Sequence, residues 1–144
     1  MKRSDEVRDV VARFYDRISA GDVEGASATI ADAPDAFVIG TQRIGDGREA
    51  WIDSIRENAE MGIAFKAGEI RAWADGDNGW AVDETAIVLP NGVAFTTRTT
   101  FVAHREPDSG FRLLHMHASW AVPDEVALEH AHAWRVQLGL QEAT

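Results

Sequence analysis

The stretch that decides the fold is Trp80–Val122, WAVDETAIVLPNGVAFTTRTTFVAHREPDSGFRLLHMHASWAV. Val, Ile, Thr, Phe and Trp alternate there with polar residues, which is typical of strands that bury one face. Turn residues interrupt the alternation twice, at Asn91-Gly92 and at Pro107–Gly110. The stretch therefore predicts three antiparallel strands, at 80–89, 93–106 and 111–122, joined by two hairpins.

Helical spacing dominates the residues that precede this meander. Ser4 followed by Asp5 and Glu6 is typical of a helix start, and Pro34 is a helix breaker. We expect helices at 4–21, 22–30, 48–61 and 125–138, and further strands at 36–41 and 65–74. Helices followed by a long meander predict an α+β fold in a single domain, 1–144, with the helices on one face of a curved sheet.

Composition narrows the classes of function. The chain has 144 residues, 45% of them hydrophobic and five of them Trp, which is enough for one well-packed core. A net charge of −10 opposes binding to nucleic acids and to anionic membranes. The absence of Cys excludes thiol nucleophiles and disulfides. With no apolar segment near its N-terminus, the chain is expected to be cytoplasmic.

Three stretches carry a family resemblance: Ala20–Gly25, Phe37–Thr41 with Asp46–Ala50, and Gly110–Trp120. In this combination they resemble the SnoaL-like group of the nuclear transport factor 2-like superfamily. The resemblance implies a cone-shaped, curved antiparallel sheet wrapped around N-terminal helices, with a pocket inside and a homodimer through the outer sheet face. Members include polyketide cyclases, steroid isomerases, dehydratases and non-catalytic association domains, so the family does not fix the function.

The sequence departs from the steroid-isomerase type. That type places a Tyr on the first helix and an Asp on the first strand, whereas this chain has Phe14, with Tyr15 beside it, and Val38-Ile39-Gly40. A second acid of that type falls near Thr100-Phe101 here. We therefore expect the isomerase machinery to be absent.

The hairpins predict which side chains face the interior. A two-residue loop at Asn91-Gly92 would place Glu84 opposite Thr99 and Asp83 opposite Thr100. A four-residue second loop would place Thr99 opposite Ala118 and Thr100 opposite His117. Glu84 then faces the interior, and Asp83, His115 and His117 face outward, although a slip of one residue would exchange the faces.

Glu84 is the sharpest catalytic candidate on this register. A lone carboxylate on an apolar wall would have a raised pKa, which suits a general acid or base near neutral pH. The alternative is that Glu84 lies at the mouth of the cone, solvated or paired with an Arg.

Asp83 and His117, with Thr100, form a second candidate cluster, because an Asp that orients a His resembles part of an acid–base relay. A hydrogen-bonded dimer interface is the favoured interpretation of that cluster. Asp83, His115 and His117 could also chelate a metal ion, but no further ligand is evident and we expect no metal.

Two functions remain open at this point. The first is a pocket for a small hydrophobic molecule, with cofactor-free acid–base chemistry of the cyclase, dehydratase or isomerase type. The second is a non-catalytic ligand-binding or dimerisation domain. The residues expected to line the pocket are mostly aromatic, as small-molecule sites are: Phe14, Tyr15, Trp51, Trp80, Thr99, Phe101, Met116 and Trp120.

Overall fold

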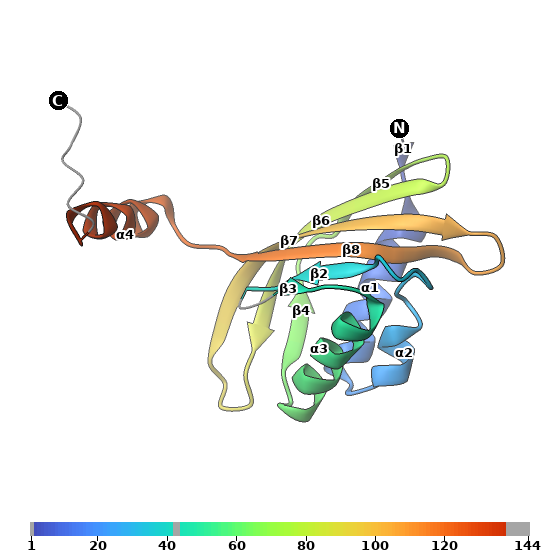
Figure 1. Cartoon of the computed structure of the whole chain (residues 1–144), viewed down its shortest axis with the longest axis horizontal. Coiled ribbons are helices and arrows are strands. Elements are labelled where there is room, and N and C mark those ends of the chain that lie inside the picture. The colour runs from blue at the N-terminus through green and yellow to red at the C-terminus, as the bar shows by residue number, and fades with distance from the viewer. Residues whose placement is uncertain (1, 42–43, 138–144) are drawn as a thin grey trace.

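The computed structural model describes residues 2–41 and 44–137. Three helices lie against one face of a curved sheet (Figure 1). They are α1 (Asp5–Ser19), α2 (Val23–Ser27) and α3 (Arg48–Glu60). The strands are β1 (Lys2–Arg3), β2 (Phe37–Ile39), β3 (Ile44–Gly45), β4 (Ala64–Ala67), β5 (Arg71–Asp75), β6 (Asn78–Val88), β7 (Ala94–Glu106) and β8 (Gly110–Trp120).

The sheet is mixed, although mostly antiparallel. Its order is β1-β5-β6-β7-β8-β2-β3, and β4 pairs with β6 beside β5. β2 runs parallel to β8, and every other paired strand is antiparallel to its neighbour. The predicted α+β class and helix-then-meander order are confirmed, with one parallel pair added.

Helix α1 supplies the centre of the core. The Oγ of Ser4 accepts a hydrogen bond from the Val7 amide and caps the helix, as its sequence predicts. One face of α1 is then buried against the sheet, where Phe14 and Tyr15 are 2% and 3% exposed.

Helix α2 ends earlier than its predicted limit at Ile30. The backbone of Thr29 and Ala31 hydrogen-bonds to Leu113 of β8, so this segment joins the sheet instead of continuing the helix.

One strand predicted at 65–74 is two strands, β4 and β5, which pair with successive halves of β6. The chain steps aside at Gly68, whose N–H donates to the Glu84 carbonyl at 2.9 Å. A Cβ added at Gly68 would lie 2.7 Å from that carbonyl oxygen, closer than two such atoms can pack. Gly68 therefore permits a bend in the sheet directly beside the middle of β6.

The predicted two-residue loop at Asn91-Gly92 is wrong. No non-glycine residue among those described has a positive φ, so Asn91 cannot take part in the type I′ turn that this loop requires. Leu89 pairs with Val93 instead, which leaves three loop residues, and the Gly92 N–H donates to the Leu89 carbonyl. Pro90 favours this wider turn because its fixed φ suits the second position of a type I turn.

That change slips the register of β6 against β7 by one residue. Asp83 lies opposite Thr99, and Glu84 lies opposite Arg98. The predicted faces of β6 are therefore exchanged, so Asp83 and Thr85 point toward the helices, whereas Glu84 points away from them.

The predicted pairing of β7 with β8 is confirmed at Thr99 with Ala118 and Thr100 with His117. Two deviations cancel to give this result. The hairpin has three loop residues between Glu106 and Gly110, and a bulge between Val102 and Ala103 restores the register further along.

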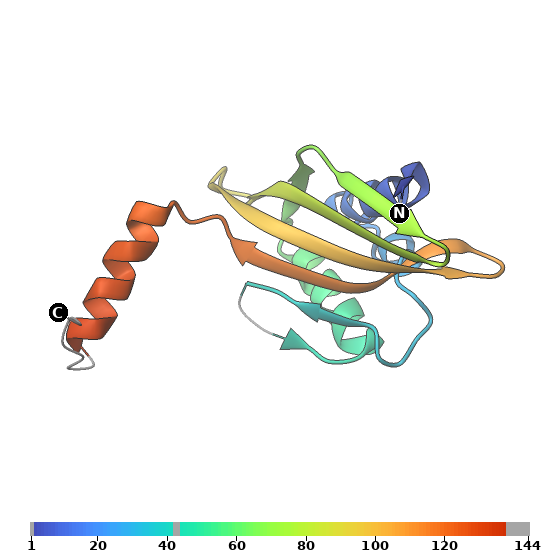
Figure 2. The ribbon, with the colours of Figure 1, turned by 90° about the horizontal axis from the view of Figure 1, so that it is seen from above.

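Helix α4 (Asp124–Gln137) begins one residue before the C-terminal helix predicted at 125–138, and residue 138 lies outside the described residues. It stands apart from the sheet and the other helices (Figures 1 and 2). Over residues 2–41 and 44–137, no helix has both the length and the apolar character needed to cross a membrane.

Candidate functional site

The strongest candidate for chemistry is a buried acid at the bend of the sheet. Asp83 lies on the inner face of β6 and is 5% exposed. Tyr15 reaches it from α1, and Thr85 and Thr99 reach it from β6 and β7. We call Tyr15, Asp83, Thr85 and Thr99 the Asp83 cluster.

Hydrogen bonds in the cluster converge on one carboxylate oxygen. Asp83 Oδ1 accepts from the Thr85 hydroxyl at 2.9 Å and from the Tyr15 hydroxyl at 3.3 Å. Asp83 Oδ2 is buried with no hydrogen-bond partner among the described residues. A buried carboxylate oxygen without a partner is rare in proteins, so this oxygen can accept or donate one further hydrogen bond.

Burial raises the pKa of Asp83 above its ordinary value, because the charged form loses its hydration. The hydroxyl groups of Thr85, Tyr15 and Thr99, which face the carboxyl, act in the opposite direction and lower that pKa in part. None of the ion pairs among the described residues includes Asp83. Burial, and then the charge of Asp83, raise the pKa of Tyr15, so its phenol stays protonated.

Aromatic rings surround the cluster on the helix side. Tyr15 stacks on Phe65 of β4 with ring centroids 6.0 Å apart and meets Phe101 edge-on at 5.7 Å. Phe14 contacts both Trp51 and Phe101 in edge-to-face geometry. These contacts supply the low-dielectric surroundings that make ionisation of Asp83 costly.

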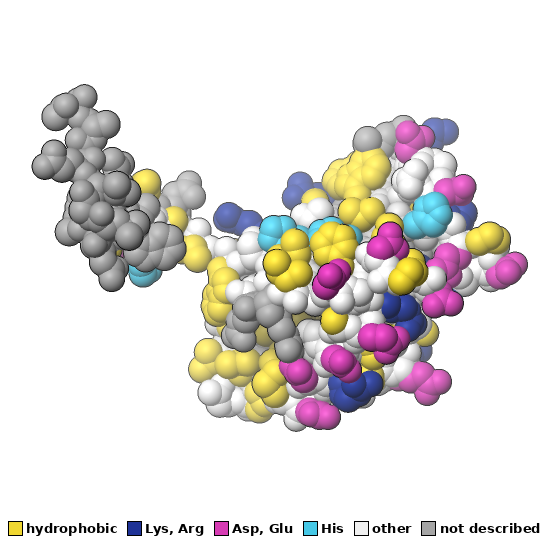
Figure 3. Space-filling view, viewed as in Figure 1, with side chains coloured by type: hydrophobic (Ala, Val, Ile, Leu, Met, Phe, Trp, Pro, Cys, Tyr) yellow, Lys and Arg dark blue, Asp and Glu magenta, His cyan; other side chains and the backbone are white. Residues whose placement is uncertain are grey.

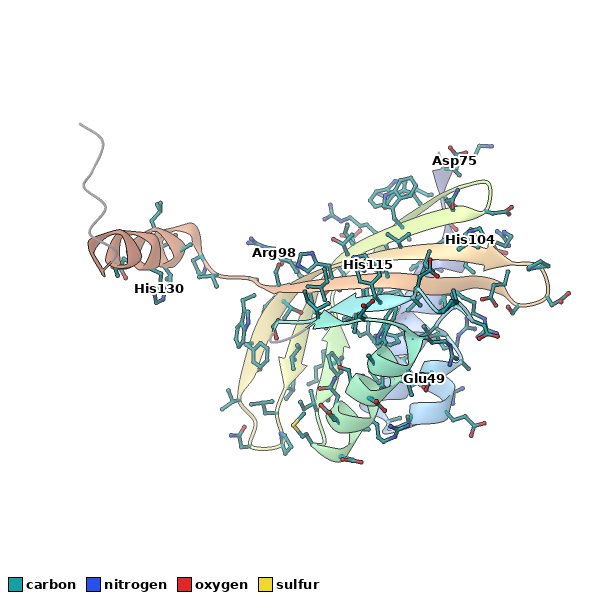
Figure 4. All side chains as sticks on the ribbon, in the orientation of Figure 1. Glu49, Asp75, Arg98, His104, His115 and His130 are labelled. Atoms are coloured by element: carbon teal, nitrogen blue, oxygen red, sulfur yellow. The ribbon has the colours of Figure 1, made fainter. Side chains whose placement is uncertain are left out.

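Glu84 does not lie in the interior, contrary to the sequence prediction. Its side chain is 65% exposed and pairs with Arg98 at 3.3 Å on the outer face of the sheet. Arg98 projects from the side of the sheet opposite the helices (Figure 4). A lone carboxyl group does lie on the inner face of the sheet, but because of the slipped register it belongs to the neighbouring residue Asp83.

The predicted association of Asp83, Thr100 and His117 is also wrong. Thr100 and His117 are exposed on the outer face, whereas Asp83 is buried on the inner one. His115 shares the outer face, where its Nδ1 lies 3.2 Å from the Phe37 carbonyl oxygen and burial lowers its pKa (Figure 4). A metal ion could not contact Asp83 and both histidines from opposite sides of the sheet.

Five of the predicted pocket residues lie together in the interior: Phe14, Tyr15, Trp51, Thr99 and Phe101. Met116 is opposite Phe101 and packs partly buried against the same core. Trp80, in contrast, lies on the outer face, where it stacks on Trp73 at 6.0 Å. The register slip explains this difference as well, because Trp80 belongs to β6.

Trp120 marks the open end of the sheet, which is the end at the β6–β7 hairpin. It is 47% exposed and stacks on Phe95 at 4.4 Å. Phe95 and Ile87 pair on the same inner face, two positions beyond Thr97 and Thr85. An apolar inner surface therefore leads from the open end toward the Asp83 cluster.

The sequence places Thr97 on the inner face of its strand, but it does not identify Thr97, Thr85 or Phe65 as site residues. All three lie on inner faces, and the Thr97 hydroxyl donates to the Thr85 carbonyl at 3.3 Å. The run of Thr residues in 96–100 offered the signal, since alternate positions of one strand must face inward.

Two surface hollows lie outside the cone. One runs along α1 and is lined in part by Asp9, Arg13 and Asp16. The other lies between α1, α2 and the β7–β8 loop and includes Arg112 and Ser109. Neither includes a residue of the Asp83 cluster.

Comparison with solved structures supports the fold. A candidate dehydratase of the NTF2-like family from Streptomyces avermitilis superposes with a TM-score of 0.73, at 23% identity over 82% of this chain and 95% of that one. An NTF2-like protein of unknown function from Pseudomonas putida KT2440 gives 0.71, at 18% identity over 84% and 88%. A candidate ketosteroid isomerase from Shewanella frigidimarina gives 0.69, at 12% identity over 81% and 96%.

None of the curated proteins matches this sequence. The family model for the SnoaL-like domain matches residues 7–124, which include all of the elements from α1 to β8 except the first two residues of α1. The chain belongs to the SnoaL-like domain family.

Proposed function

We propose that the inner face of the sheet binds a small hydrophobic molecule and that Asp83 is the group that transfers its protons. The observation that carries this proposal is the buried carboxyl of Asp83, whose Oδ2 has no partner within the described residues. A substrate hydroxyl or an acidic C–H group would supply that partner.

The surroundings of Asp83 suit acid–base chemistry without a cofactor. A raised pKa makes the carboxylate a stronger base once it is ionised and keeps the neutral, proton-donating form present at a higher pH than for an ordinary Asp. Tyr15 and Thr99 would orient the carboxyl and hydrogen-bond an oxygen of the substrate. The reaction class is cyclisation, dehydration or isomerisation of an uncharged, largely apolar molecule.

The second candidate is a non-catalytic ligand-binding or dimerisation domain. The edge-to-face contacts of Phe14 with Trp51 and Phe101 favour it, because these rings fill interior volume that a substrate would otherwise use. In that case Asp83 would serve only to orient a ligand or to hold Tyr15 in place.

A model proton abstraction separates the two candidates. In the Kemp elimination of 5-nitrobenzisoxazole, a carboxylate removes the ring C–H proton, the C–H electrons form a nitrile, and the N–O bond breaks to release a phenolate. We expect wild type to accelerate this reaction above acetate at equal concentration, Asp83→Asn to abolish the acceleration, and Glu84→Gln to retain it.

Nile red fluorescence measures apolar binding in the same three proteins. Binding that is unchanged by Asp83→Asn, together with proton abstraction no faster than in acetate for every variant, would replace the catalytic proposal with the binding one.

A homodimer through the outer sheet face stays a prediction, and the character of that face supports it. Trp73, Trp80, Val102 and His115 lie on it, and hydrophobic and His side chains neighbour each other there (Figure 3). Light scattering at micromolar concentration tests the prediction: Val102→Glu should lower the mass of the assembly if this face forms an interface.

A further inference from the structure

Four large apolar side chains are exposed around the open end of the sheet: Ile44, Met61, Val93 and Trp120. Their exposed fractions are 69%, 54%, 54% and 47%. They come from β3, the end of α3, the β6–β7 hairpin and the end of β8. We call these four residues the apolar rim.

Contacts of neighbouring residues place the rim at one end of the molecule. Gly62, next to Met61, lies against Pro90 of the hairpin, where an added Cβ would be 3.4 Å from the proline ring. Trp120 stacks on Phe95, two residues from Val93. Ile44 pairs with Ile39, which is level with His117 of β8.

Helix α4 carries exposed apolar side chains that no other described element covers. The described side chains from Glu125 to His130 are all exposed, and Leu128 is 69% exposed. A helix of 14 residues is marginally stable in water without packing. The family match ends at residue 124, where α4 begins.

The connection to β8 directs α4 away from its own body. The Ala121 N–H donates to the Thr96 carbonyl at 3.0 Å and continues the sheet past Trp120, and Ala121 and Val122 are both half-buried. Pro123 then stiffens the last residue before the helix. Figures 1 and 2 show α4 extended outward from this point. An arm held in this way can reach a second molecule without any rearrangement.

We propose that α4 packs on the apolar rim of a second copy of this chain, and that the second copy returns its own α4 in the same way. The reciprocal exchange closes with twofold symmetry, so it yields a dimer rather than a filament. Leu128 leaves water against Met61 and Val93 of the partner copy, and the open end of each cone is covered by the other copy. The exchange does not depend on whether Asp83 is catalytic.

Disulfide trapping tests the exchange in the full-length chain. The sequence has no Cys, so Val93→Cys combined with Leu128→Cys creates one defined pair. Mild oxidation should give a covalent dimer on a non-reducing gel, reversed by dithiothreitol. The control is Ala28→Cys with Leu128→Cys, since Ala28 is exposed in the hollow between α2 and the β7–β8 loop, which includes Ser109.

Each outcome of the trapping decides the proposal. Covalent dimer that forms at least about tenfold faster for the Val93 pair than for the Ala28 pair supports the exchange. A disulfide within one chain, which keeps the monomer mass, would show that α4 covers its own cone and would overturn the proposal. Equal rates for the two pairs would overturn it as well, because they indicate random collision.

A variant without new cysteines gives an independent check. In a Val102→Glu background, which removes any contribution of the outer sheet face, Leu128→Glu places a charge in the proposed contact and should weaken the remaining dimerisation by about a hundredfold, since the exchange buries two copies of the residue. Glu129→Gln, at the next position of the same helix, should leave it unchanged. Equal dimerisation with and without Leu128→Glu in sedimentation equilibrium would contradict the exchange.

Discussion

Replacing Asp83 by Asn should change how the stability of the protein depends on pH. The amide has the shape of the carboxyl but cannot ionise, so it removes the cost of a buried charge. Oδ2 of Asp83 has no partner among the described residues and the side chain is 5% exposed, so an ionised Asp83 pays most of that cost. The amide also lacks a partner there, so the substitution removes only the cost of the charge. Above the raised pKa of Asp83, we expect Asp83→Asn to raise the free energy of unfolding by about 1.4 kcal/mol for each unit by which folding raises that pKa.

The sign of the pH dependence follows from proton binding. Because the pKa of Asp83 is raised in the folded protein, the unfolded chain releases this proton at a lower pH than the folded one does. Between the ordinary aspartate value of 3.8 and the raised value, the free energy of unfolding of wild type therefore falls as pH rises. The fall relative to Asp83→Asn is at most about 1.4 kcal/mol per pH unit, and the difference vanishes below pH 3.8.

Urea unfolding followed by Trp fluorescence measures both proteins across this pH range. Glu84→Gln is the matched control, because it makes the same chemical change one residue away on the exposed face. Its effect should stay within about 0.5 kcal/mol at every pH. A difference between wild type and Asp83→Asn that is independent of pH, or that grows as pH falls, would refute the account of Asp83 as a buried acid without a charge partner.

Three further substitutions test other parts of the structure. Tyr15→Phe removes a hydroxyl that donates to Asp83 Oδ1, so the pKa of Asp83 should rise further. An NMR titration would show this as a higher midpoint for the carboxyl carbon of Asp83. An unchanged midpoint would mean that the 3.3 Å contact does not stabilise the carboxylate. Gly68→Ala would place a Cβ 2.7 Å from the Glu84 carbonyl oxygen, a backbone atom that cannot rotate away. It should lower the free energy of unfolding, measured in urea, by about 1–3 kcal/mol. An unchanged free energy of unfolding would show that the bend relaxes easily. Ser4→Ala removes the acceptor of the Val7 amide and should cost about 1 kcal/mol, or roughly 3 °C in the thermal midpoint, whereas Ser4→Asp should retain the cap.

The helices and the three long strands of the meander, with their order, could be predicted from the sequence because their signals are local, whereas the two-residue strands β1 and β3 could not. The spacing of Val7, Val11 and Phe14 predicts an amphipathic helix without knowledge of its partners. Ser4 marks the start of that helix, because its side chain accepts a hydrogen bond from a first-turn amide. The alternation in β7 likewise predicts its inner residues, Thr99 and Phe101, without knowledge of the partner strand.

The identity of the buried acid could not be predicted, because it depends on a single residue of loop length. Asn91-Gly92 is the preferred sequence of a two-residue loop, and Pro90 shifts the turn by one position. That shift alone places Asp83 instead of Glu84 on the inner face of β6, and it places Trp80 on the outer face. In the second hairpin, the bulge after Val102 compensates the shorter loop, and no local signal announces such a bulge.

The carboxyl-carbon NMR titration of the protein, with Asp83→Asn to assign the signal, tests the central claim most directly. We predict one aspartate carbon, absent from the variant, whose midpoint lies clearly above the ordinary value of 3.8 and moves when a hydrophobic ligand such as Nile red binds. If the midpoint of the Asp83 signal lies at or below 3.8 and does not change when the ligand binds, the carboxyl is solvated or paired with a cation. The proposal that it transfers protons inside the cone would then be wrong.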